Sequence, residues 1–207
     1  ISDLRQRQAL PLRAKVLMSQ NRIREWYDHF DGDVYISFSG GKDSTVLAHL
    51  VHDLYPNVPL VFANTGLEFP EIQSFAREAG AEFIRPKMMF SDVISKYGYP
   101  IISKENAETI HGARIIKNGT RGRRKGYGEP RTNGNGTWLN WRRKALHGMP
   151  PFENGFYNKH KWLPLARDTQ FNISHYCCNV MKKEPMYRYQ KEHGFYPIIG
   201  TLTEESV

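Results

Sequence analysis

Apolar stretches alternate with polar breaks along this chain, and their spacing predicts strands that alternate with helices. Short runs rich in β-branched and aromatic residues predict buried strands at 34–38, 58–63, 81–85 and 196–200. Apolar residues at helical spacing predict amphipathic helices at 12–30, 45–54, 70–78 and 186–193. Because such alternation builds right-handed βαβ units, the pattern predicts an α/β fold with a doubly wound, mostly parallel sheet of about five strands.

The expected helix at 12–30 starts beside Pro11, where a first helical turn tolerates proline. Its apolar residues would pack either on the edge of the sheet or on a partner subunit, so a homodimer is one alternative. Asp31-Gly32-Asp33 is expected to end it.

A glycine turn follows the strand at 34–38 and precedes the helix at 45–54. Its sequence is Ser39-Gly40-Gly41-Lys42-Asp43-Ser44. Glycines let the backbone approach an oxyanion, and the N–H groups and positive dipole end of a new helix point at it. Lys42 adds a positive charge, and Ser39 and Ser44 add hydroxyl donors. This stretch is therefore a candidate anion site.

Ser-Gly-Gly-Lys-Asp-Ser after a strand resembles the pyrophosphate loop (PP-loop) of the adenine nucleotide alpha-hydrolase superfamily. It is not the G-x-x-x-x-G-K-[ST] nucleotide loop, which needs four residues between its glycines. The resemblance implies that Gly40, Gly41, Lys42 and Ser44 hold phosphates of ATP or an adenylyl sulfate, while Ser39 and Asp43 shape the loop. Asp43 is also a candidate ligand for Mg²⁺. Lys42 and Asp43 are the candidate catalytic residues here.

A second motif, Asn64-Thr-Gly-Leu-Glu-Phe-Pro-Glu71, follows the second expected strand. It resembles the Asp-Thr-Gly-x-x-Phe-Pro-Glu-Thr motif of phosphoadenosine phosphosulfate (PAPS) reductases, with Asn64 in place of the aspartate. Both motifs follow strand ends and should face one crevice. The nucleotide-binding candidates are Phe62, Asn64, Thr65, Gly66 and Glu68, with the adenine lying against backbone near Phe62 to Asn64. Further along, Ser103 is expected to cap a helix.

Two motifs near the end of the sequence extend the resemblance to PAPS-reductase-like proteins. Cys177-Cys178 with the lysines and proline that follow matches Cys-Cys-x-x-x-Lys-x-x-Pro, and the last residues match Gly-x-x-x-x-Glu-Ser. Leu202 stands where many relatives have arginine. The anion-binding candidates from this region are Lys182, Lys183, Gly200 and Glu205.

The chain's basic excess lies in one segment. The whole chain carries 29 Lys and Arg against 21 Asp and Glu, whereas residues 111–161 alone carry 12 against 2. Nine glycines and several aromatic residues are interleaved with these charges. The composition predicts a flexible insertion, 111–161, within a single PP-loop domain spanning 1–207.

Arginine, glycine and aromatic residues together suit phosphate backbones and unpaired bases, so nucleic acid is one expected partner. The candidate contacts are Arg121, Arg123, Arg124, Lys125, Arg142 and Arg143. The alternative is a lid that closes over the nucleotide phosphates.

The adjacent cysteines, Cys177 and Cys178, are candidate catalytic residues with three interpretations. They resemble half of the ligand set of an iron–sulfur (4Fe–4S) cluster. One thiolate near Lys182 and Lys183 could instead carry sulfur as a persulfide. The third interpretation is two inert, partly buried side chains.

Two cysteines and no apolar run near the roughly 20 residues of a membrane span favour a cytoplasmic protein. The sequence starts at Ile1 and stops at Val207 within a motif, so we expect the natural chain to continue.

Three functions remain open on the sequence. The first is an ATP pyrophosphatase that activates an acceptor for sulfur transfer, as in DNA phosphorothioation or RNA thiolation, with a cysteine desulfurase or thiol protein as sulfur donor. The second is a PAPS or adenylyl-sulfate reductase. The third is a nucleotide- or nucleic-acid-binding module without turnover.

Overall fold

The computed structural model describes residues 2–101, 103–117, 144–150, 153–155, 158–167, 170 and 172–201. The chain forms two compact units. The first comprises residues up to 89 together with those from 181 onward, and the second comprises residues 90–180.

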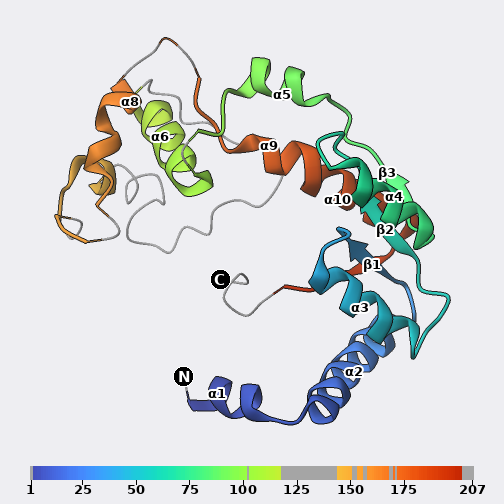
Figure 1. Cartoon of the computed structure of the whole chain (residues 1–207). Coiled ribbons are helices and arrows are strands. Elements are labelled where there is room, and N and C mark those ends of the chain that lie inside the picture. Colours follow the sequence, from blue (N-terminus) through green and yellow to red (C-terminus); the bar gives the residue numbers. More distant parts are fainter. Residues whose placement is uncertain are drawn as a thin grey trace. The chain divides into compact units, whose positions relative to one another are not determined.

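The first unit is built on a parallel sheet of four strands among the described residues. They are β1 (Val34–Phe38), β2 (Leu60–Ala63), β3 (Glu82–Ile84) and β4 (Tyr196–Ile198), in the order β3-β2-β1-β4. The helices α3 (Lys42–His52) and α4 (Pro70–Glu78) connect β1 to β2 and β2 to β3 (Figure 1). Because β2 and β4 flank β1 on opposite sides, the strand order reverses at β1. Such a reversal is where ligands bind in open α/β sheets.

Alternate residues of β1 enter two different hydrophobic cores. Val34, Ile36 and Phe38 pack with Ile23, Ala48 and Ala76, which belong to α2 (Leu12–His29), α3 and α4. Tyr35 faces the other way and packs with Tyr189 of α10 (Glu184–His193). Helices therefore cover both faces of the sheet, which confirms the doubly wound α/β fold.

The N-terminal helices of the first unit are α1 (Ser2–Ala9) and α2. Only the second half of α2 reaches the core, through Ile23, which is 4% exposed. The helix ends in a left-handed turn, with Asp31 at φ 51° and Gly32 at φ 86°, and the Gly32 N–H donates to the Tyr27 carbonyl (2.9 Å). The structure thus ends α2 where the sequence predicts.

Several boundaries differ from the sequence-based expectation: β3 and β4 are shorter than expected, α10 begins two residues earlier, and two further differences have a clear local cause. The helix expected from residue 45 begins at Lys42, because Gly41 is extended and its carbonyl already accepts the Thr45 N–H (3.0 Å). The strand expected from residue 58 begins at Leu60, because the Val58 N–H donates to Tyr55 in a turn (3.2 Å). The helix predicted at 70–78 is confirmed as α4.

The second unit is helical, with α5 (Phe90–Tyr97), α6 (Lys104–Lys117), η1 (His160–Trp162), α8 (Leu163–Arg167) and α9 (Tyr176–Cys178). Its core joins Ala107 and Ile110 of α6 to Ile173 and the side chains of α8. Ser103 caps α6 as predicted, accepting the Asn106 N–H at its Oγ (3.2 Å). A single parallel bridge pairs Tyr99 with Ile173.

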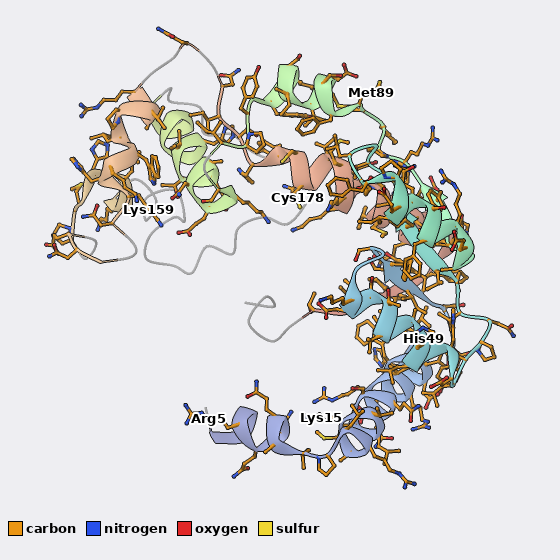
Figure 2. The ribbon with its side chains drawn as sticks, viewed as in Figure 1. Arg5, Lys15, His49, Met89, Lys159 and Cys178 are labelled. Atoms are coloured by element: carbon orange, nitrogen blue, oxygen red, sulfur yellow. The ribbon has the colours of Figure 1, made fainter. Side chains whose placement is uncertain are left out.

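The expected insertion, 111–161, starts inside α6 and has structured residues near its end. Residues 144–147 are helical, and Ala145 and Leu146 are buried. Lys159, labelled in Figure 2, donates its N–H to the Ala145 carbonyl (2.9 Å) and pairs its Nζ with Glu105 of α6 (3.2 Å). The described parts of this segment therefore bury more side chains than its composition predicts.

Tyr35 and Tyr189 make the first unit sensitive to alkaline pH. Burial raises the pKa of Tyr35 from 10.0 to about 12. Burial and the hydrogen bond to the Glu82 carboxylate (2.9 Å) raise the pKa of Tyr189. Both tyrosines keep their protons longer in the folded state than in the unfolded state. Their contribution to stability is therefore complete below pH 10 and lost as the pH rises toward 12.

We therefore expect the free energy of unfolding to fall as the pH rises above 10. The measurement is denaturant unfolding at a series of alkaline pH values. Tyr35→Phe should weaken this dependence, because it removes the buried hydroxyl group whose pKa is raised. An equal slope in the wild type and Tyr35→Phe would contradict the assignment to Tyr35.

Candidate nucleotide-binding site

The six-residue glycine loop connects the carboxyl end of β1 to the start of α3. Gly41 is the N-cap residue of α3, and no side chain caps the helix. The first turn of an uncapped helix presents backbone N–H groups and a positive dipole end. Helix starts of this kind can bind an oxyanion, and anion binding at this loop stays a prediction.

The two serines of the loop are hydrogen-bonded to each other, Ser39 at an exposed position and Ser44 at a buried one. Ser44 is buried and donates its hydroxyl hydrogen to the Gly41 carbonyl (3.0 Å), while its Oγ accepts the Ser39 N–H (3.2 Å). The two Oγ atoms are 3.1 Å apart. Since the hydroxyl hydrogen of Ser44 goes to Gly41, Ser39 is the donor between the two hydroxyls. Both serines therefore brace the loop, and phosphate binding by Ser44 stays a prediction.

Gly40 is the point at which the loop contacts α4. It has φ 72°, a conformation that favours glycine, and a Cβ at this position would lie 2.8 Å from Cγ2 of Ile72. The sequence indicates a glycine turn here, but it does not identify Ile72 as the residue with which a side chain at position 40 would collide.

Lys42 and Asp43 form the first turn of α3, and both are exposed. Among the described residues, neither side chain has a recorded hydrogen bond or ion pair. An ammonium group and a carboxylate thus stand beside the uncapped helix start, available to a ligand.

The loop after β2 is held by its own side chains. Both Glu68 carboxylate oxygens accept hydrogen bonds from Thr65, one from its N–H (3.0 Å) and one from its hydroxyl (2.7 Å). Asn64 Oδ1 accepts the Gly66 N–H (3.0 Å). A carboxylate would make the same contact, so the substitution of asparagine for aspartate keeps the turn.

Two of the predicted nucleotide-binding residues of this loop, Phe62 and Glu68, already have partners within the protein. Phe62 is buried in the core, with its ring 4.9 Å from that of Phe83, so only its backbone can face a ligand. Glu68 stabilises the loop, and Leu67 and Phe69 are exposed. Adenine binding near 62–64 stays a prediction.

Gly200 brings the end of β4 against the glycine loop. A Cβ at Gly200 would lie 3.2 Å from the Asp43 carbonyl oxygen, so the backbones approach closely here. Glu205 and Leu202 lie outside the described residues.

The cysteines and the lysines that follow them belong to different units. Cys177 and Cys178 are free, partly exposed, and end α9 in the second unit, and Figure 2 labels Cys178. Lys182 and Lys183 are exposed in a π-helical turn, η2 (Asn179–Lys183), which leads into α10. Pro185 explains this wide turn, because its ring excludes a regular α-helical bond to the preceding turn.

The described residues fit the predicted Mg²⁺ site better than the predicted iron–sulfur cluster. No group of three or more His, Cys, Asp or Glu side chains in the described part of the chain could hold a metal ion. An iron–sulfur cluster needs four ligands, and Cys177 and Cys178 supply two. Mg²⁺ needs only one or two carboxylates when phosphates complete its shell, so Asp43 fits that role.

The six basic residues proposed for nucleic-acid contact, Arg121, Arg123, Arg124, Lys125, Arg142 and Arg143, lie outside the described residues. Their role stays a prediction. Within the described ranges, no helix combines the length and apolar composition that a membrane crossing requires.

Sequence reasoning also missed a hollow in the first unit. It has a volume of about 930 Å³ and is lined by α2, the outer side of α3 and the end of β4. Arg22, Trp26 and His29 line it together with Asp43. One feature of the sequence could have indicated it. Arg22, Trp26 and His29 follow one another at spacings of four and three residues, which places their side chains on one face of α2.

A parallel sheet with an uncapped glycine loop at its reversal point is the arrangement in which open α/β sheets bind ligands. Residues 33–109 match the phosphoadenosine phosphosulfate reductase domain, which is part of the adenine nucleotide alpha-hydrolase superfamily.

Two curated relatives carry the same name. The chain is 32% identical over 62 residues to the phosphoadenosine 5'-phosphosulfate reductases of Escherichia coli O139:H28 (strain E24377A / ETEC) and Shigella flexneri serotype 5b (strain 8401). The aligned stretch is 30% of this chain and spans 25% of each relative. The similarity is thus to the loop-bearing region of these proteins, and the chain spans about a quarter of their length.

Proposed function

We propose that the protein is an ATP pyrophosphatase that cleaves ATP between the α and β phosphates and adenylates an acceptor, which then reacts with sulfur. The observation that carries this proposal is the complete Ser39–Ser44 loop, closed by its serines, with Lys42 beside the uncapped start of α3. We further propose that the chain acts as one nucleotide-binding domain with a basic insertion.

In the proposed reaction, an acceptor oxygen attacks the α phosphorus, the bond to the bridging oxygen of the β phosphate breaks, and pyrophosphate leaves. A phosphodiester oxygen attacks as an anion and has no proton to lose, whereas an acceptor that carries a proton releases it to solvent. The α3 N–H groups and Lys42 would stabilise the charge on the phosphates, so positioning and electrostatics carry the catalysis. Asp43 would hold Mg²⁺, which neutralises developing charge on the phosphates when bound.

Nucleic acid is the acceptor class that the charge distribution favours. Residues 111–161 carry 12 Lys and Arg against 2 acidic residues, more than one nucleotide requires. DNA phosphorothioation and RNA thiolation both fit this chemistry. The sulfur would come from a cysteine desulfurase or thiol protein, with Cys177 or Cys178 as a candidate persulfide carrier.

The second candidate is reduction of PAPS or adenylyl sulfate. The names of the relatives and the Cys177–Cys178 pair favour it. The two reactions differ in their products, because a reductase releases sulfite whereas a pyrophosphatase releases pyrophosphate.

We expect the wild type to convert α-labelled ATP and Mg²⁺ into AMP or an adenylated acceptor, with pyrophosphate. Asp43→Ala should slow this by about a hundredfold or more, because charge stabilisation at the phosphates is lost. Asp53→Ala, at the opposite end of α3, is the matched control and should retain activity. The measurement is product analysis with and without DNA or RNA, and stimulation by one polymer would identify the acceptor.

If the protein releases sulfite from adenylyl sulfates and does not cleave ATP, the pyrophosphatase proposal is wrong and the protein is a reductase. Tight ATP binding without pyrophosphate release would instead indicate a binding module without turnover.

A further inference from the structure

The hollow beside the glycine loop has the size and chemistry of a second ligand site. Its volume of about 930 Å³ lies within the range of small-molecule pockets. Val46 and Ile199 contribute to its apolar surface and are more than half exposed. Asp43 and Gly200 place one end of it beside the phosphate loop.

Trp26 presents an oriented aromatic surface in this hollow. Its side chain is 40% exposed, yet its ring meets Phe30 edge-on at 4.7 Å. Phe30 in turn stacks on Tyr196 at 3.8 Å. Because these contacts fix the indole from one side, its remaining surface is available for stacking without reorganisation.

The polar residues of the hollow carry both signs of charge. Arg22 contributes a positive charge, Glu25 and Asp43 contribute negative charges, and His29 adds an imidazole ring. Such a mixture does not favour a bare phosphate, which requires a positive excess. A guanidinium and a carboxylate beside an aromatic ring instead match a nucleobase, whose edge carries both acceptors and amino donors.

We propose that this hollow binds an unpaired nucleobase of the nucleic-acid acceptor, stacked on Trp26, with Arg22 and Glu25 at its edge. This inference rests on the proposed function, because it places the acceptor next to the loop that would bind ATP. A base paired in a duplex cannot reach such a platform, so single strands or flipped bases are the ligands.

The test measures binding of a short fluorescein-labelled single-stranded oligonucleotide, as DNA and as RNA, by anisotropy without ATP. Trp26→Ala should weaken binding by about five- to a hundredfold, because base–aromatic stacking is lost. Trp26→Phe should retain most of the affinity. Arg22→Ala should also weaken binding, whereas Arg24→Ala should not.

Arg24 is the matched control for Arg22, because it lies on the same helix but bonds Asn21 (2.9 Å) and does not line the hollow. Equal losses in the two variants would indicate nonspecific attraction and overturn the proposal. Duplex binding as tight as single-strand binding, and equally unaffected by Trp26→Ala, would also overturn it.

Two further measurements test whether the hollow binds something other than a nucleobase of nucleic acid. If Trp26→Ala abolishes ATP binding, the hollow holds the adenine of ATP instead. If the wild type is a dimer in sedimentation and Trp26→Ala is a monomer, the hollow is an interface with a second copy. Either result would overturn the proposal.

Failure of the proposed function has a different signature. Suppose that the wild type releases no pyrophosphate and that Trp26→Ala weakens single-strand binding. The hollow would then still be a nucleobase site, but the ATP reaction would be rejected. Pyrophosphate release with unchanged oligonucleotide binding in Trp26→Ala would retain the pyrophosphatase and reject the nucleobase site.

Discussion

Gly40→Ala should reduce ATP affinity by about tenfold or more, because a left-handed alanine and a displaced loop each cost binding free energy. A Cβ at position 40 would lie 2.8 Å from Cγ2 of Ile72, and the φ angle of 72° already disfavours any side chain. The loop can accept alanine only by moving away from α4, which shifts the N–H groups that would bind the phosphates. Isothermal titration with ATP measures the loss.

Gly80→Ala is the matched control for this substitution. Gly80 has φ 75°, but nothing lies within 4 Å of a Cβ placed there, so its variant keeps the backbone penalty without the collision. It should lose some stability and retain ATP binding. Adding Ile72→Ala to Gly40→Ala should recover part of the affinity by removing the collision. Unchanged ATP affinity in folded Gly40→Ala would show that the loop does not bind the nucleotide.

Replacing Arg121, Arg123, Arg124 and Lys125 by alanine should flatten the salt dependence of nucleic-acid binding. If all four contact phosphates, the slope of log affinity against log salt should decrease in magnitude by about 3. The measurement is oligonucleotide affinity at several salt concentrations, with the total charge and length of the oligonucleotide held constant.

Removal of four exposed positive charges elsewhere provides the control. Arg5, Arg13, Lys15 and Lys191 lie on α1, α2 and α10, and Figure 2 labels two of them. Their joint replacement by alanine should change the slope much less. Equal slopes in the insertion variant and the wild type would exclude this surface, and a loss of ATP affinity instead would favour a lid over the phosphates.

Most of the first unit could be predicted because local signals determine it. The alternating runs predict β1 and α4 at their observed bounds, and the glycine loop falls between β1 and α3. The Asn64 turn keeps its geometry because its contacts span only two or three residues. Family motifs, which are local, identified the right family for the same reason.

The features that sequence reasoning missed depend on distant residues. The contact between Gly40 and Ile72 joins residues on different elements, and the hollow combines α2 with the end of β4. The expectation of about five strands compares with four in the described chain, and these four are the strands that the sequence located, with shorter bounds for β2, β3 and β4. Contacts between residues that are far apart in the sequence leave no recognisable pattern in any one short stretch of it.

The order of strands also bears on how the chain acquires its structure during synthesis. β1 pairs in parallel with β4, whose residues leave the ribosome only after the whole second unit. Until then, β1 presents one unpaired edge, the kind of surface that promotes association between nascent chains. The β4 side of the glycine loop, where Gly200 approaches Asp43, can form only after this pairing. A ribosome stalled before residue 196 would therefore present a three-stranded sheet with one exposed edge, to which chaperones can bind.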